Sequence, residues 1–161
     1  MSPTEFVNKL KDKRIEVTTR TLLNYETNGL IPKPERHGEG RGRGKSTDYP
    51  DGALYEFMAS YQLINGAEHR INQKLVKQFR EKALELEQKT DWTPEKLLKE
   101  YSENIREVFG SVFWLQYRDL AKEGIPLNSG AGVQYFVKDG KLEKKINLPV
   151  QGERVAAGIK W

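Results

Sequence analysis

The segment TTRTLLNYETNGLIP, residues 18–32, carries the signals of a short helix together with both of its ends. Thr18 or Thr19 can cap its start, because a threonine hydroxyl accepts a hydrogen bond from a free amide of the first turn. Gly29 favours the left-handed conformation that ends a helix, and Pro32 prevents the helix from continuing. The apolar body of this predicted helix consists of Leu22, Leu23 and Tyr25.

Another short helix is predicted just before this segment. Ser2 can cap it, Pro3 suits its first position, and Glu5 can complete a capping box. Two short helices separated by a few residues are typical of a helix-turn-helix. The apolar stripe of the first helix, at helical spacing, is made of Phe6, Val7 and Leu10.

A basic segment without hydrophobic periodicity follows at residues 33–45. It holds five Lys or Arg against two Glu, a net charge of +3, and its glycines let a backbone approach phosphates closely. Taken alone, the segment fits a solvated loop equally well. Its position directly after a helix-turn-helix favours a wing that contacts DNA, in part through a narrow minor groove. The basic residues are Lys33, Arg36, Arg41, Arg43 and Lys45.

Residues 18–32 resemble the signature of the MerR family of bacterial regulators. In that family a recognition helix of the form ser-x-arg-thr-leu-arg-tyr-tyr-glu precedes a glycine, two leucines and a proline. The stretch YPDGAL, residues 49–54, is similar to the family's next helix start, tyr-ser-x-x-asp-leu, and the likeness spans residues 2–80. This chain departs from the family at Leu23, Asn24 and Thr47, where an arginine, an aromatic residue and another arginine are usual.

The resemblance implies that the second helix enters the major groove of double-stranded DNA. Arg20 can donate two parallel hydrogen bonds to a guanine, and the threonines can reach a phosphate or a thymine methyl group. Tyr25 is expected to contact the DNA backbone or to pack against the wing. The predicted DNA-binding residues are Thr18, Thr19, Arg20, Thr21, Tyr25, Lys33, Arg36, Arg41, Arg43, Lys45 and Tyr49.

The helical periodicity continues in the second half of the chain. A helix starting at residues 49–51, another over residues 68–88 and a long stretch over residues 93–122 are predicted. The long stretch carries a seam that fits either a homodimer interface or a core face, and Gly110-Ser111 could divide it. Its members are Leu98, Tyr101, Ile105, Val108, Val112 and Leu115.

The C-terminal part changes to the alternating pattern of strands. Apolar residues alternate on both sides of Asp139-Gly140, a dipeptide that favours a two-residue hairpin turn. Residues 154–161 could add a third strand. The fold class expected is therefore mostly α with small β: a winged helix-turn-helix domain over residues 1–90, then a helical segment and a C-terminal β-hairpin over residues 91–161.

Several function classes are disfavoured by the composition. The chain has no Cys, and its two imidazoles, His37 and His69, lie far apart in sequence, so we expect no metal site. No Ser/His/Asp set and no paired carboxylates in an apolar site can be picked out, so we expect no cofactor and no enzyme activity. The segment GRGRGKS, residues 40–46, is no P-loop, because Glu39 replaces the required glycine. No apolar run could span a membrane and no signal peptide is evident, so a cytoplasmic protein is expected.

The sequence thus predicts sequence-specific binding to double-stranded DNA, by a homodimer that acts as a MerR-like bacterial transcription regulator. The net charge of +4 favours an anionic partner only weakly. One alternative is an architectural or accessory DNA-binding protein of a phage or mobile element. Another is a protein-interaction adaptor that binds its partner through the aromatic tail. A cluster of aromatic residues could line a small-molecule effector pocket, although a small core or a dimer interface is the commoner role; it comprises Phe109, Phe113, Trp114, Tyr117, Tyr135 and Phe136.

Overall fold

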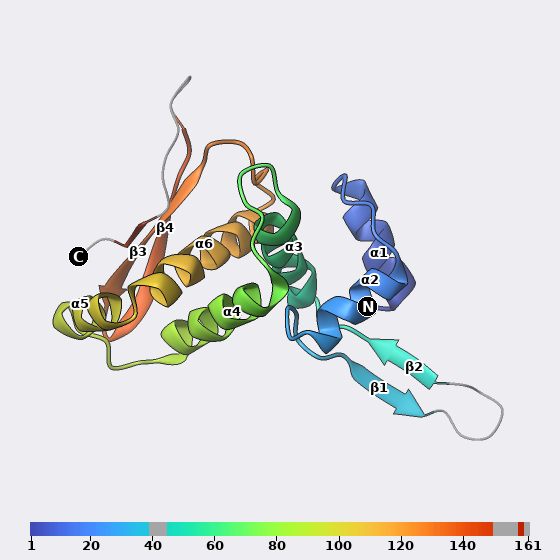
Figure 1. Cartoon of the computed structure of the whole chain (residues 1–161), viewed down its shortest axis with the longest axis horizontal. Helices are drawn as coiled ribbons and strands as arrows, with labels where there is room; N and C mark the ends of the chain where they lie inside the picture. The colour runs from blue at the N-terminus through green and yellow to red at the C-terminus, as the bar shows by residue number, and fades with distance from the viewer. Residues whose placement is uncertain (39–44, 150–157, 160–161) are drawn as a thin grey trace. The chain divides into compact units, whose positions relative to one another are not determined.

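The computed structural model describes residues 1–38, 45–149 and 158–159 (Figure 1). The chain divides into two compact units, Met1–Phe57 and Met58–Trp161. The sequence predicted the boundary near residue 90 instead. The division falls earlier because α4 (Gln73–Gln88) packs along α6 (Ile105–Lys122) and so belongs with the C-terminal half. Helices dominate both units, beside two small sheets, which confirms the mostly α class with small β.

Two helices open the first unit, α1 (Pro3–Asp12) and α2 (Thr19–Thr27). The caps are those that the sequence predicts: Ser2 Oγ accepts from the Glu5 amide and Thr18 Oγ1 from the Thr21 amide, each at 3.2 Å. Gly29 has φ of 70°, and the Leu30 amide bonds back to the Tyr25 carbonyl at 2.9 Å. This arrangement satisfies the last carbonyls of α2 and ends the helix.

The core of the first unit is aromatic at its centre. The Tyr25 ring stacks on the Phe57 ring with centroids 4.4 Å apart, and Phe6 meets Phe57 and Tyr49 edge-on. Offset and edge-on contacts of this kind stabilise aromatic cores beyond the area they bury. Aliphatic side chains complete the core, namely Leu10, Leu22, Leu30 and Ile31.

A two-stranded antiparallel hairpin follows, made of β1 (Glu35–Gly38) and β2 (Lys45–Asp48). The register places Glu35 opposite Asp48 and Gly38 opposite Lys45. Of the basic segment predicted as a wing, residues 35–38 and Lys45 lie in the strands of this hairpin. Arg41 and Arg43 lie outside the described residues.

The second unit contains the end of α3 (Gly52–Asn65), α4, α5 (Pro94–Glu103) and α6. The long predicted stretch is indeed interrupted, but at Asn104 rather than at Gly110. Gly110 lies within α6, where a Cβ atom would stand 2.4 Å from the Phe79 ring. A glycine is therefore needed here for α4 and α6 to approach, and not as a helix breaker. Helix α4 also begins later than predicted, at a cap formed by Asn72.

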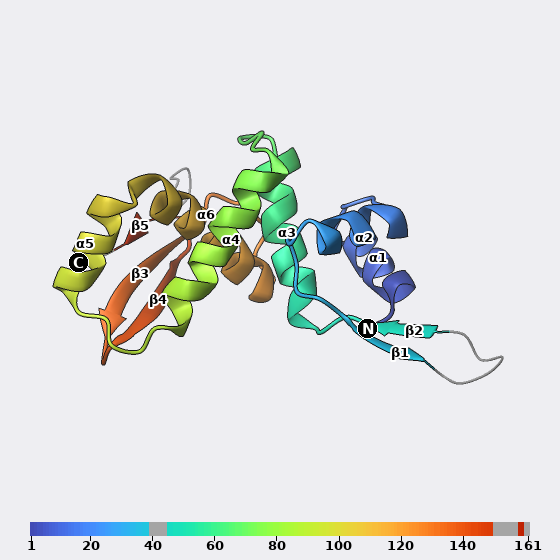
Figure 2. The same ribbon diagram turned by 60° about the horizontal axis from the view of Figure 1, so that its bottom comes forward.

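The C-terminal hairpin is confirmed as β3 (Gly132–Lys138) and β4 (Lys141–Asn147). Asp139 and Gly140 both have positive φ, 52° and 81°, as the predicted turn requires. A short strand β5 (Gly158–Ile159) pairs parallel to β3, which gives the sheet order β4-β3-β5. Strand β3 packs on α6, and the two views in Figures 1 and 2 show this sheet beside α6.

Candidate nucleic-acid interface

Helix α2 has one buried side and one exposed side. Leu22 and Tyr25 point into the core of the first unit, and this burial fixes which side of the helix remains in solvent. The exposed residues are Thr19, Arg20, Leu23, Asn24 and Thr27. We call these five residues the α2 face. It is the surface that α2 offers to a partner molecule.

The amino-terminal end of this face gathers three of the predicted residues. Thr18, Thr19 and Arg20 are all exposed there, whereas Thr21 is half-buried, with its hydroxyl 3.3 Å from that of Thr18. The Arg20 guanidinium makes no hydrogen bond or ion pair with any residue that the structure describes. An exposed, unpaired cation beside free helix amides favours anionic partners.

Glu26, in the last turn of α2, forms the hub of a small polar cluster. Its Oε1 accepts hydrogen bonds from Arg36 Nη2 at 2.6 Å and from the Tyr49 hydroxyl at 2.8 Å. The bond from Arg36 lowers the pKa of Glu26. Burial, aided by the bond to Glu26, raises the pKa of Tyr49 to about 12. The cluster ties β1 and the residue after β2 to α2.

Two of the predicted DNA contacts are corrected by burial. Tyr25 and Tyr49 are only 2% and 3% exposed, and their rings pack on Phe57 and Phe6. These rings therefore support α2 and the hairpin from inside the unit and cannot lie against DNA. Arg36 is half exposed, but its guanidinium is held by Glu26.

The remaining basic candidates lie near the hairpin. Lys33 is exposed, directly before β1. Lys45 opens β2, where the structure describes its backbone but not its side chain. Arg41 and Arg43 fall in the segment between the strands that is not described.

Sequence reasoning missed three members of the α2 face, Leu23, Asn24 and Thr27. Leu23 was assigned to the apolar body of the helix, yet it is 48% exposed, and Asn24 was noted only as a departure from the MerR pattern. The signal that could have found Leu23 and Asn24 is the helical spacing itself. Once Leu22 and Tyr25 are taken as the buried pair, the two residues between them must turn outward.

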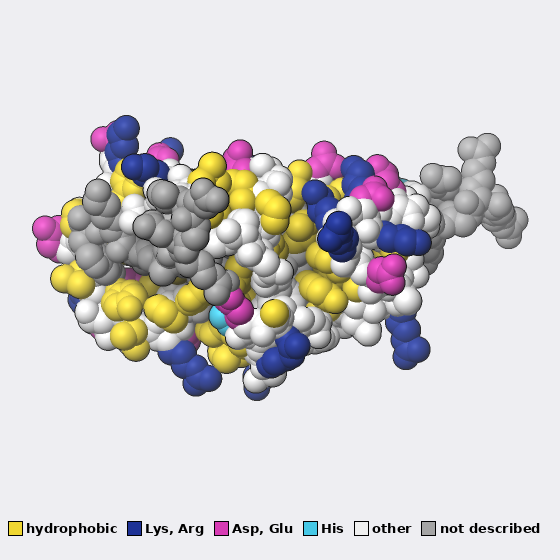
Figure 3. Space-filling model, turned by 90° about the horizontal axis from the view of Figure 1, so that it is seen from above, with side chains coloured by type: hydrophobic (Ala, Val, Ile, Leu, Met, Phe, Trp, Pro, Cys, Tyr) yellow, Lys and Arg dark blue, Asp and Glu magenta, His cyan; other side chains and the backbone are white. Residues whose placement is uncertain are grey.

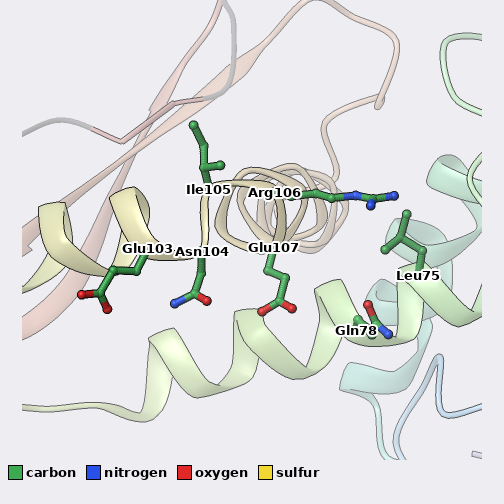
Figure 4. Close-up of a pocket in the computed structure, with 7 residues that line it drawn as sticks. All are labelled: Leu75, Gln78, Glu103, Asn104, Ile105, Arg106 and Glu107. Carbon is green, nitrogen blue, oxygen red and sulfur yellow. The ribbon is translucent and has the colours of Figure 1, made fainter.

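The second unit has a hollow of about 280 Å³ between α4 and the junction of α5 and α6. Figure 4 shows Asn104 and Glu107 pointing toward α4, while Ile105 points away from it. The lining mixes carboxylates, amides and one guanidinium and brings together no nucleophile and base. The lining residues are Leu75, Gln78, Glu103, Asn104, Ile105, Arg106 and Glu107.

Three of the six residues of the aromatic cluster, Trp114, Tyr117 and Tyr135, belong to the core, and Phe113 and Phe136 are half-buried. Trp114 is fully buried and donates to Ser60 Oγ at 3.0 Å, and the Tyr135 hydroxyl donates to the buried Asp119 at 2.8 Å. Tyr117 is buried too, and its hydroxyl lies 3.0 Å from His69 Nε2. Phe109 differs, because it is 53% exposed. The cluster therefore fits a small core with one exposed edge better than an effector pocket.

Among the described residues, no group of three or more His, Cys, Asp or Glu could hold a metal ion. None of the helices described is both long and apolar enough to cross a bilayer. Comparisons of the chain with protein-family models, with curated proteins and with solved structures gave no match.

Proposed function

We propose that this chain binds double-stranded DNA and reads its sequence with the α2 face. The observation that carries the proposal is Arg20, an exposed guanidinium without a partner among the described residues, at the start of a helix whose other side is anchored in a core. A helix so held can enter a major groove without losing its own packing. The resemblance of residues 18–32 to MerR regulators supports the same assignment.

In this proposal the hairpin acts as the wing of a winged helix-turn-helix. Lys33, Arg41, Arg43 and Lys45 neutralise phosphates and set affinity. Arg20 donates hydrogen bonds to base edges and sets specificity. The Glu26 cluster supports these separate roles for the hairpin and for Arg20, because it holds the hairpin at a fixed position against α2.

The test is selection of bound fragments from a random duplex library by the full chain. We expect enrichment of a defined site for the unaltered chain and a relaxed site for Arg20→Ala. Lys9→Ala, an exposed change on α1 away from the α2 face, is the matched control and should select the same site. Absence of any bound duplex at low salt would overturn the proposal.

The biological role that fits best is a cytoplasmic bacterial transcription regulator. An architectural role, such as a phage or mobile-element accessory protein, uses the same interface with less sequence selection. The library experiment separates the two roles. A sharply defined site that recurs upstream of genes supports regulation, whereas broad binding without a consensus supports architecture.

We further propose that two copies pair through the second unit. The inner members of the predicted seam, Val108, Val112 and Leu115, are buried within their own chain, so they cannot form the interface. Exposed apolar side chains remain on α5 and α6, and Figure 3 shows hydrophobic side chains at the surface of the second unit. They are Leu98, Ile105 and Phe109.

Sedimentation of the full chain over a range of concentrations tests this pairing. Replacing Ile105 and Phe109 together with Ser should yield a monomer, while Lys99→Ser, an exposed polar change on α5, should leave the association unchanged. If the unaltered chain stays monomeric, the pairing is overturned, and a different protein partner for these side chains, the adaptor role, becomes the hypothesis to test.

A further inference from the structure

Leu23 is an apolar side chain in an otherwise polar surface. It is 48% exposed, and it is the one large hydrophobic residue that is exposed among the described residues of the first unit. In α1 and α2, Phe6, Leu10 and Leu22 are fully buried, and Val7 is half-buried. The core of this unit is therefore complete without Leu23.

The position of Leu23 within the α2 face is central. It lies three residues after Arg20 and four residues before Thr27, so all three side chains share one side of the helix. Asn24 is exposed beside it. A single leucine among polar neighbours is too small to dock another protein, which needs a far larger apolar area.

A leucine on a DNA-facing helix has few favourable contacts. It cannot hydrogen-bond to phosphate, and covering a polar base edge with it would desolvate that edge without compensation. The major groove offers one apolar group, the C5 methyl of thymine. An aliphatic side chain can pack on this methyl group and exclude water from both.

We propose that Leu23 is a specificity-determining residue that packs on the C5 methyl group of a thymine in the major groove. This inference rests on the proposed function, because it requires that α2 contacts DNA. It goes beyond that function by naming the base and the atom that are read. It also gives a role to the position where the MerR pattern has an arginine.

The test begins with the duplex that the full chain selects from a random library. Each thymine of that duplex is replaced in turn by deoxyuridine, which removes the C5 methyl group and nothing else. We expect one replacement to weaken binding about fourfold, the effect of losing one buried methyl group. For Leu23→Ala the thymine and deoxyuridine duplexes should bind equally.

Two variants sharpen the comparison. Leu23→Met keeps an apolar side chain of similar size and should retain the preference for thymine. Lys9→Ala, an exposed change on α1 outside the α2 face, should retain it as well. Since both Leu23 and Lys9 are exposed, all of these variants should fold, which far-ultraviolet circular dichroism checks.

The outcomes are distinguishable. If the chain selects a site but no deoxyuridine replacement weakens binding, or if Leu23→Ala still prefers thymine, the role of Leu23 is overturned while DNA binding stands. If the chain selects no duplex at all, the proposed function itself is overturned, and the inference about Leu23 is overturned with it.

Discussion

The Arg36 guanidinium donates a hydrogen bond of 2.6 Å to Glu26 Oε1, which joins strand β1 to the last turn of α2. The same oxygen accepts the Tyr49 hydroxyl, so one carboxylate holds both ends of the hairpin. Glu26 is only 10% exposed on its side chain, and a carboxylate in that setting is stable because it is paired. The geometry of the proposed interface therefore depends on a residue that need not touch DNA.

This cluster predicts a pH dependence. The folded state lowers the pKa of Glu26, so its stabilisation is complete above the ordinary glutamate value, about 4.3, and is lost as pH falls through the lowered folded value. We expect the free energy of unfolding to fall over this acidic range, and Glu26→Gln to remove part of that slope. Denaturant titrations followed by circular dichroism at several pH values measure it. Glu5→Gln, an exposed glutamate of α1, is the control and should keep the slope.

Arg20 is expected to control preference at one base pair. Arg20→Ala should relax selection at that position and cost about 1–3 kcal/mol of binding to the selected site, because a bidentate contact to guanine is lost. Lys33→Ala, which removes a predicted phosphate contact, should instead weaken binding to all sequences alike. It should also reduce the slope of the log binding constant against the log salt concentration by about one. Fluorescence anisotropy on selected and scrambled duplexes distinguishes the two patterns. A uniform loss for Arg20→Ala would contradict base reading.

Arg14 occupies a strained position in the turn between α1 and α2. Its φ is 64°, and its neighbour Ile15 bonds back to the Leu10 carbonyl at 2.9 Å, as at a helix end that normally carries glycine. Left-handed backbone costs about 1–2 kcal/mol in a residue with a Cβ atom, and glycine loses about 0.5–1 kcal/mol through extra freedom in the unfolded chain. Arg14→Gly should therefore raise stability by several tenths of a kcal/mol or more. Lys13→Gly, with an ordinary φ of −99°, should lower it.

The buried carboxylate of Asp119 holds several elements of the second unit together. It is 1% exposed and accepts from Arg118 Nη2 at 2.8 Å and from the Tyr135 hydroxyl at 2.8 Å, with Lys144 Nζ at 3.3 Å. Asp119→Asn removes the charge that these groups surround and should cost about 3 kcal/mol. Tyr135→Phe removes one hydrogen bond to a charged acceptor and should cost about 1.5–3 kcal/mol.

Tryptophan fluorescence is the measurement suited to these two variants. Trp92 and Trp114 are buried in the second unit and residues 1–57 contain no tryptophan, so the signal reports no unfolding of the first unit. Burial also raises the pKa of Tyr135 well above its ordinary value, so its stabilising effect should be lost only in strongly alkaline solution. Equal stability of Asp119→Asn and the unaltered chain would contradict this role.

Local sequence signals predicted the features that local physics controls. The caps at Ser2 and Thr18, the end of α2 at Gly29 and the turn at Asp139-Gly140 each depend on a few neighbouring residues, and each is present. The predictions that failed depended on distant partners. Tyr25 is buried because its ring packs on Phe57, and Tyr49 because its ring packs on Phe6. The spacing of the two tyrosines in the sequence does not reveal these contacts.

The same contrast explains the errors in the second half. Judged from its sequence neighbours alone, Gly110 resembles a helix breaker. In the structure, the missing side chain of Gly110 leaves space for the ring of Phe79, which lies 31 positions earlier on α4. The domain boundary near residue 90 was predicted from a break in periodicity, whereas the packing of α4 on α6 groups α4 with the second compact unit. On the α2 face, Arg20 could be predicted from its motif, and Leu23 required knowledge of which side of the helix is buried.

Gly140 combines two constraints whose effects can be separated. Its φ is 81°, and a Cβ atom there would stand 2.1 Å from the Thr90 carbonyl oxygen. Gly124, after α6, has a similar φ of 72° with nothing within 4 Å of its Cβ position. Gly124→Ala should therefore cost only the left-handed backbone, about 1 kcal/mol, while Gly140→Ala should cost at least about 1 kcal/mol more, because the Thr90 segment must also move. Denaturant unfolding followed by tryptophan fluorescence compares the two, and an equal loss would show that the contact between Gly140 and Thr90 adapts without cost.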